Sequence, residues 1–149
     1  MSSVRVGKIL GLYRATNDET LSTTSLSFDE KGIINDKHYD KNIQRSVLIA
    51  SQKSYALALS HGIDAPPHTL GENILMDYNP YHLSAGARIT IGSLVLEISQ
   101  NCTLCKSLAK VDTKLPKILK KDRGIFAKVI SSGTIHLDDD IYIQTPSID

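Results

Sequence analysis

The sequence predicts one β-rich domain with a few short helices, folded as a barrel. Short apolar and β-branched stretches recur along the chain between turn-forming residues, and many short strands in one domain are typical of a barrel. The length of 149 residues suits a single domain over 1–149, and no repeat, low-complexity tract or linker divides it. With 5% aromatic residues and no Trp, the core is expected to consist of Ile, Leu and Val.

The first third of the chain predicts two strands and two loops. Val4, Val6 and Ile9 can share one buried surface of a strand, whereas the polar residues 16–24 favour a loop. Residues 33–44 have little apolar content, which suits an exposed loop over a site. In order, we expect a strand over 4–13, a loop over 16–24, a strand over 25–28 with a turn over 29–32, and a loop over 33–44.

The middle of the chain predicts the longest helix. Ser51 can cap the N–H groups of its first turn, an apolar face is available at Tyr55, Leu57, Ala58 and Leu59, and Gly62 ends it. The two prolines of residues 65–68 cannot continue a helix or a central strand. In order, we expect a buried strand over 45–50, a helix from Ser51 to Gly62, a rigid connector over 65–68 and a strand over 70–75.

The last third carries the clearest strand signal. Two apolar, β-branched stretches are joined by Gly92-Ser93, which can form a tight hairpin turn. Pro116 interrupts mixed helical spacing between residues 102 and 121, so short helices and a loop are expected there. In order, we expect strands over 86–92 and 94–98, short helices within 102–121, a strand over 124–130, and closing strands at 135 and 141–143.

Charge and hydropathy exclude several classes of partner. A formal charge of +1 provides no field over the whole surface that could hold a nucleic acid, so any anion site must be local. No apolar run approaches the roughly 20 residues that span a bilayer, and the N-terminus lacks the pattern of a signal peptide. We therefore expect a cytoplasmic protein that binds neither nucleic acid nor membrane.

Cys102 and Cys105 are the two cysteines, and their spacing admits several interpretations. In a reducing compartment they are expected to be thiols. A zinc site would have to recruit His ligands, because no second Cys pair exists. A thioredoxin-like pair requires a βαβ context that this β-rich pattern does not offer. What remains is one reactive thiolate that serves as nucleophile, sulfur carrier or soft metal ligand, or else an inert buried thiol. Cations at Lys106, Lys110 and Arg123 would favour the thiolate.

A second group of candidates lies in the polar middle loop. Asp36-Lys37-His38 places an acid, a base and an imidazole in three residues, and Arg45 follows. Lys37, His38 and Arg45 could hold a phosphate or a pterin phosphate, although a cluster of this kind is also typical of a solvated loop.

Gly71-Glu72-Asn73 forms the third group of candidates. Glu72 could orient a ligand amine and Asn73 could cap a turn, although the same residues also suit a simple turn before a strand. The other four histidines lack metal-ligand spacing and are expected to be ordinary surface or half-buried residues. They are His61, His68, His82 and His136.

The order of these motifs resembles the MOSC domain, named from the C-terminal domain of molybdenum cofactor sulfurases. The likeness runs from about Val6 to Ile143, and GENI and RGIFAKV are its more specific parts. Asn35 stands where the family usually has Gly, and Asn tolerates the positive φ of such a turn. The matching segments are Asp36-x-His38, Arg45-Ser-Val-Leu-Ile, Gly71-Glu72-Asn73-Ile74, Gly86-x-Arg88-x-x-Ile91-Gly92, the cysteine region and Arg123-Gly124-Ile125-Phe126-Ala127-Lys128-Val129.

This resemblance implies both a fold and a function. The fold is a closed, pyruvate-kinase-barrel-like β-barrel with a pocket for molybdenum cofactor (molybdopterin), and Cys105 is the expected sulfur carrier or molybdenum ligand. The implied reaction is reduction of N-hydroxylated compounds, with electrons from a partner electron-transfer protein, because the chain has no flavin or iron–sulfur motif. The alternative is a non-catalytic carrier whose cysteine takes persulfide sulfur from a cysteine desulfurase. In either case Asp36, Lys37, His38, Arg45, Glu72, Asn73 and Arg123 are expected to form the pocket.

Overall fold

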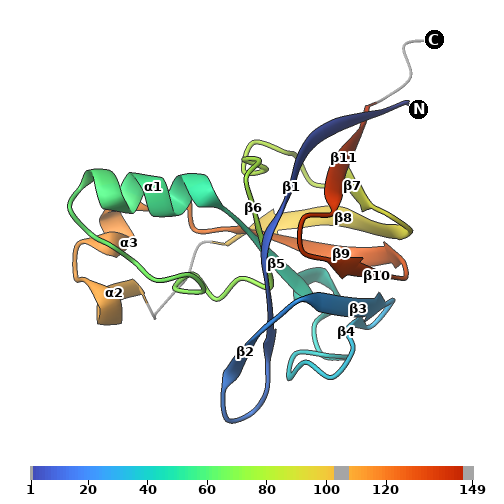
Figure 1. Cartoon of the computed structure of the whole chain (residues 1–149), viewed down its shortest axis with the longest axis horizontal. Coiled ribbons are helices and arrows are strands. Elements are labelled where there is room, and N and C mark those ends of the chain that lie inside the picture. The colour runs from blue at the N-terminus through green and yellow to red at the C-terminus, as the bar shows by residue number, and fades with distance from the viewer. Residues whose placement is uncertain (1, 103–107, 146–149) are drawn as a thin grey trace.

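A closed β-barrel forms the body of the molecule (Figure 1). The computed structural model describes residues 2–102 and 108–145. Seven strands follow one another in the order β11-β7-β8-β9-β5-β6-β1, and β1 pairs again with β11, which closes the ring and confirms the expected barrel. The elements are β1 (Ser2–Ala15), β2 (Thr20–Thr23), β3 (Ser25–Asp29), β4 (Gly32–Ile33), the 3-10 helix η1 (Ile43–Arg45), β5 (Val47–Ser51), α1 (Gln52–Ser60), β6 (Ile74–Met76), β7 (Arg88–Ile91), β8 (Leu94–Asn101), α2 (Leu108–Val111), α3 (Leu115–Ile118), β9 (Ile125–Ser131), β10 (Gly133–His136) and β11 (Asp140–Thr145).

Strand β1 closes the barrel because it is long enough to pair with three neighbours. Its first half pairs antiparallel with β11, from Ser2 opposite Thr145 to Lys8 opposite Asp140. Its second half pairs with β6 and β2. The register shifts in both halves, and such irregularities bend a strand, as closure requires.

Strand β5 is buried on both faces, which explains its continuous apolar sequence. Val47 and Ile49 belong to the barrel core, whereas Ala50 belongs to a second cluster beneath the helices. The neighbouring strand β6 divides in the same way, with Ile74 in the core and Leu75 in the second cluster. Alternate side chains of each strand therefore hold two layers together.

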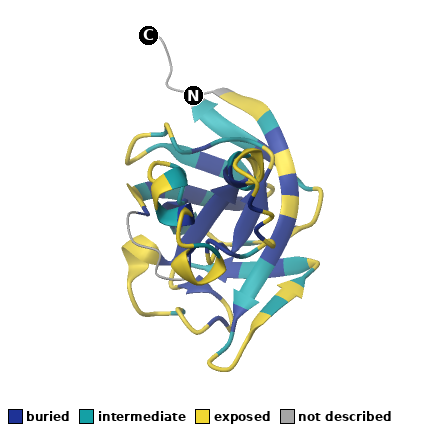
Figure 2. Ribbon diagram, turned by 90° about the vertical axis from the view of Figure 1, so that its left-hand side faces the viewer, coloured by how far each residue is buried: buried dark blue, intermediate teal, exposed yellow. Residues whose placement is uncertain are grey.

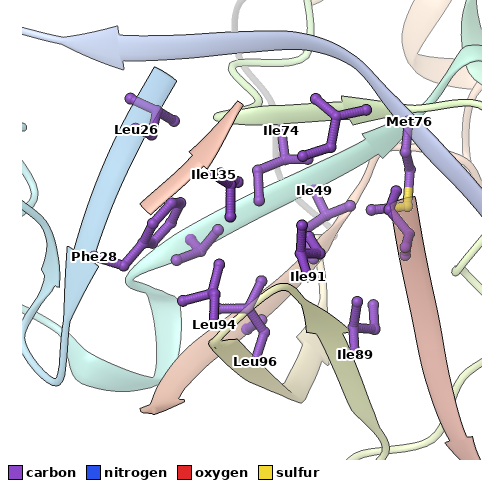
Figure 3. Close-up of a cluster of buried hydrophobic side chains, with 14 of the residues drawn as sticks. Leu26, Phe28, Ile49, Ile74, Met76, Ile89, Ile91, Leu94, Leu96 and Ile135 are labelled. Atoms are coloured by element: carbon purple, nitrogen blue, oxygen red, sulfur yellow. The ribbon is translucent and has the colours of Figure 1, made fainter. Parts of the chain in front are cut away.

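A small sheet of β10, β3 and β4 packs onto the barrel. Leu26 and Phe28 of β3, Ile33 of β4 and Ile135 of β10 join the same hydrophobic cluster as the barrel strands. Figure 3 shows Leu26, Phe28 and Ile135 beside the aliphatic side chains of the ring. The core is dominated by Ile and Leu, in line with the composition.

The helices gather on one side of the barrel (Figures 1 and 2). Helix α1 begins as expected, because the Ser51 hydroxyl accepts a hydrogen bond from the Lys53 N–H, and it connects the parallel strands β5 and β6. Ala58 of α1 and Leu115 of α3 pack in the second cluster. Within residues 2–102 and 108–145, no helix is both long enough and apolar enough to cross a bilayer.

Several local expectations were wrong. Residues 20–23 form a strand rather than a loop, because they pair with the end of β1 despite their polarity. Arg45 lies in η1, so the strand begins only at Val47. Val4 is 51% exposed and Leu59 is 59% exposed, so neither belongs to the buried surface expected for it.

The loop expected over 33–44 and the strand expected over 70–75 are also shorter than predicted. Ile33 belongs to β4 and is buried in the core. Strand β6 starts only at Ile74, because the chain turns at Gly71, which has a φ of +80°.

Candidate functional site

A pocket of about 410 Å³ opens where η1, the start of β5 and the loop before β6 meet. Its polar wall consists of His38, Arg45, Ser46 and Asn73. Its apolar wall consists of Leu48, Leu70 and Phe126, with Gly71 between the two walls. The fold thus brings three separate motifs of the sequence, around residues 38, 45 and 73, to one place.

Asp36 anchors the loop that carries His38 into this pocket. The loop turns at Asn35, whose φ of +69° confirms the positive φ expected there. One Asp36 oxygen accepts from the Ala15 N–H at 2.7 Å, and the other accepts from the His38 N–H at 2.8 Å. Burial would raise the pKa of Asp36, but hydrogen bonds from the His38 side chain, the His38 N–H and the Ala15 N–H outweigh it and lower the pKa. Asp36 is therefore ionised at neutral pH.

The ionised Asp36 determines which nitrogen of His38 is available to a ligand. His38 Nδ1 lies 3.0 Å from Asp36 Oδ1. A carboxylate only accepts hydrogen bonds, so Nδ1 carries the hydrogen and donates it. Nε2 is then left for the pocket, and the His38 side chain is 57% exposed. His38 can consequently accept a hydrogen bond or a proton from a bound molecule.

Arg45 is the cation of the pocket. Its guanidinium carbon lies 4.5 Å from the centroid of the Phe126 ring, a cation–π contact that holds the charge at the rim. Arg45 is exposed, so the guanidinium edge can donate to an anion while its face stays on the ring.

Asn73 forms part of the wall and also joins two strands of the barrel. Its Oδ1 accepts from the Leu48 N–H at 3.0 Å, and its Nδ2 donates to the Tyr13 carbonyl at 3.2 Å. Its own backbone N–H donates to the Leu48 carbonyl at 2.8 Å. Both ends of the side-chain amide are thus hydrogen-bonded within the barrel. Asn73 therefore contributes more to the shape of the pocket than to the contacts available to a ligand.

The family model of the MOSC domain matches residues 29–142, which is most of the chain. This chain belongs to the MOSC domain family. No curated protein gave a match.

Solved structures support the fold of this MOSC domain. The YuaD protein from Bacillus subtilis is 21% identical, with a TM-score of 0.85 over 98% of this chain and 99% of that one. YiiM from Escherichia coli is 16% identical, with a TM-score of 0.68 over 95% of this chain and 72% of that one. YiiM from Geobacillus stearothermophilus is 12% identical, with a TM-score of 0.66 over 99% of this chain and 77% of that one.

Glu72 of this MOSC domain lies behind the pocket wall and does not line the pocket. The carboxylate is 0% exposed and accepts the Tyr55 hydroxyl at 2.8 Å and 2.7 Å on its two oxygens. The His68 N–H also points to it at 3.4 Å. Burial raises the pKa of Glu72, and burial beside Glu72 raises that of Tyr55. Glu72 thus supports the loop that carries Leu70 and Gly71.

The structure describes only one of the two cysteines. Cys102 is 6% exposed and packs with Leu48 and Phe126, so it lies beneath the apolar wall of the pocket. Its N–H donates to the Gly124 carbonyl at 2.9 Å. Cys105 lies outside the described residues. Within those residues, no group of three or more His, Cys, Asp or Glu side chains could hold a metal ion.

Gly124 allows β9 to approach β5 beside Cys102. Its φ is +120°, and a Cβ at this position would lie 3.0 Å from Leu48 Cδ1 and 3.2 Å from the Ile49 carbonyl oxygen. Glycine is therefore required here, because a side chain would press on the wall of the pocket.

Lys37 and Arg123 do not line the pocket. Lys37 is exposed, and its N–H donates to the Ala15 carbonyl at 2.8 Å. Arg123 donates to the Pro116 carbonyl at 2.5 Å and so secures the segment that contains α3. No sequence pattern indicated Phe126 as the ring beneath Arg45, or Tyr55 as the partner of Glu72. No spacing in the sequence links either pair, since the barrel alone brings them together.

Proposed function

We propose that this pocket binds molybdenum cofactor, or a related sulfur-containing species, with Cys105 as the sulfur ligand. The observation that carries the proposal is that His38, Arg45 and Asn73 share one pocket with an apolar wall that Cys102 underlies. Cys105 follows Cys102 by three residues, and chain geometry limits this separation to about 11 Å. The proposed setting is the cytoplasm.

The residues of the pocket suit a molybdopterin-type group. A volume of about 410 Å³ falls within the range of small-molecule sites. Arg45 offers a cation to a phosphate, and His38 Nε2 offers a polar contact. Leu48, Leu70 and Phe126 give a flat ring system an apolar surface. When bound, the cofactor would supply two-electron redox chemistry at molybdenum, for which a thiolate is a suitable soft ligand.

The proposed reaction is reduction of N-hydroxylated compounds. The N–O bond breaks, two electrons arrive from a partner electron-transfer protein, two protons are taken up, and the amine and water are released. His38 could pass on one of these protons, because Asp36 holds its Nδ1–H and leaves Nε2 to take up a proton and then donate it in the pocket. Arg45 would retain the anionic part of the ligand at the rim.

The experiment measures molybdenum in protein purified from a host that makes the cofactor. We expect stoichiometric molybdenum in the wild type and in Cys102→Ser, and loss of molybdenum in Cys105→Ser. Cys102→Ser is the matched control, because the same substitution is made three residues away. Molybdenum that persists in Cys105→Ser would overturn the assignment of the ligand.

The same preparations test the alternative role as a sulfur carrier. They are incubated with a cysteine desulfurase and cysteine, and the intact mass is recorded. An added sulfur atom on Cys105, in protein that contains no molybdenum, would replace the cofactor proposal with persulfide transfer. If the protein contains no molybdenum and gains no sulfur atom, both proposed functions are wrong.

A further inference from the structure

Positive charge is concentrated in the segment of α2 and α3. Residues 110–123 contain six cationic side chains and two acidic ones, which gives this segment a charge of +4, whereas the whole chain has +1. The remainder of the chain is consequently acidic in balance. This cationic segment lies on the helical side of the barrel (Figure 1).

The lysines of this segment are exposed and form no ion pair with any residue that the structure describes. Lys110, Lys114, Lys117, Lys120 and Lys121 are all exposed, and none forms an ion pair within the described part of the chain. Elsewhere, Arg5, Lys31, Arg88 and Lys128 each lie beside a carboxylate. The cations of α2 and α3 are therefore available to a partner molecule.

Apolar surface lies among these cations. Val111 of α2 is 43% exposed and lines a hollow together with Lys110. Lys114, Lys117 and the half-buried Ile118 line a hollow of about 670 Å³. A hollow with an apolar residue and a cationic rim suits an apolar side chain flanked by carboxylates.

This surface also adjoins the candidate site. Lys110 and Val111 line a second hollow of about 370 Å³ together with Gly71, and Gly71 also lines the candidate pocket. A protein seated on α2 and α3 would therefore lie next to the pocket mouth.

We propose that Lys110, Lys114, Lys117, Lys120 and Lys121, with Val111 and Ile118, form a docking surface for an acidic protein. Exposed apolar residues favour a protein over a nucleic acid, because strands of nucleic acid are held by cations together with aromatic or Arg stacking. The residues of this surface include no Phe, Tyr or Trp, and Arg123 donates to Pro116. The proposal holds for any reaction in the pocket.

The test measures fluorescence anisotropy of a short synthetic peptide in which glutamates flank one leucine. We expect binding that weakens with salt, and amide chemical shifts that change at His61 and at residues 110–121. Lys114→Glu combined with Lys117→Glu should weaken binding about ten-fold, since each exposed charge pair contributes up to about 1 kcal/mol. The matched control, Lys8→Glu with Lys41→Glu, makes the same change of charge on exposed lysines outside the surface and should change affinity less than two-fold.

Two further probes decide between occupants. A peptide with Ser in place of Leu should bind about five-fold more weakly, because the apolar contact is lost. Oligo-dT of the same length should bind more weakly than the acidic peptide. Tighter oligo-dT binding at the same residues, or equal peptide binding by the two double variants, would overturn the proposal. Molybdenum content of Lys114→Glu/Lys117→Glu is measured in parallel and should match the wild type, so failure here is distinct from failure of the pocket's proposed function.

Discussion

Two loops of this MOSC domain each bury a carboxylate, but they shift its pKa in opposite directions. Asp36 is held by two backbone N–H groups and an imidazole, which lower its pKa despite burial. Glu72 is held mainly by the Tyr55 hydroxyl, and its deeper burial raises its pKa. The number and type of donors, and not burial alone, decide whether a buried acid is easily ionised.

Because their carboxylates differ in pKa and in hydrogen-bond partners, the two loops have different roles. The ionised Asp36 orients His38 toward the pocket, so its loop contributes a functional group. Glu72 and Tyr55 stay behind the wall and support the loop of Leu70 and Gly71, so they contribute shape. A motif that is contiguous in sequence, Gly71-Glu72-Asn73, is thereby divided between the pocket and its support.

The largest effect is expected for Glu72→Ala. It removes the partner of a buried hydroxyl and leaves a cavity, so the free energy of unfolding should fall by about 3 kcal/mol. Urea denaturation measures the change. Tyr55→Phe is the control that removes only the hydroxyl and should cost about 1.5 kcal/mol. A loss below about 1 kcal/mol for Glu72→Ala would show that Glu72 does not support the loop.

Asp36→Ala should have the next largest effect. Two backbone N–H groups and an imidazole lose their acceptor, and we expect a loss of about 2 kcal/mol in urea denaturation. The change should also release the His38 ring, which is visible as altered imidazole chemical shifts. If Asp36→Ala leaves those shifts unchanged, the carboxylate does not orient His38.

The pH dependence of stability should sharpen the comparison, with smaller effects of opposite sign. The lowered pKa of Asp36 contributes stability above its ordinary value of 3.8, and this is lost as pH falls through the folded pKa. The raised pKa of Glu72 contributes stability below 4.5, which is lost as pH rises through the folded pKa. In urea titrations from about pH 3 to about pH 8, Asp36→Asn should flatten the acid limb and Glu72→Gln the limb above 4.5. Unchanged limbs in both variants would contradict the assigned directions.

His38→Ala should have the smallest effect on stability. The ring is 57% exposed, so the free energy of unfolding should change by less than about 0.5 kcal/mol. Together with Asp36→Ala, this variant measures how much of the Asp36 contribution belongs to the backbone N–H groups. If the two variants lose the same free energy of unfolding, the whole Asp36 contribution belongs to its contact with the imidazole.

Much of the fold could be predicted because its signals are local. Ser51 caps α1 as expected, and the hairpin of β7 and β8 turns at Gly92 with a φ of +60°. Strand β2 could not be predicted in this way, since its residues are polar and become a strand only by pairing with β1. Exposed edge strands depend on a neighbour more than on their own composition.

The structure brings together only some of the candidate site residues. His38, Arg45 and Asn73 do meet, as the order of motifs indicated, whereas Lys37, Glu72 and Arg123 do not line the pocket. Their residue types suit a binding site, but the direction of each side chain depends on its backbone and neighbours. Cys105 stays a prediction, since it lies outside the described residues.

By itself, the sequence determined the family, the aliphatic barrel core and most of the strands, because these depend on local pattern and composition. Only the tertiary structure decided which polar residues face the pocket and which form hydrogen bonds elsewhere in the protein. Tertiary packing joins residues far apart in the chain, such as Asp36 with Ala15 and Asn73 with Tyr13. Their hydrogen bonds form only when these segments lie side by side in the folded protein, so no local pattern can encode them.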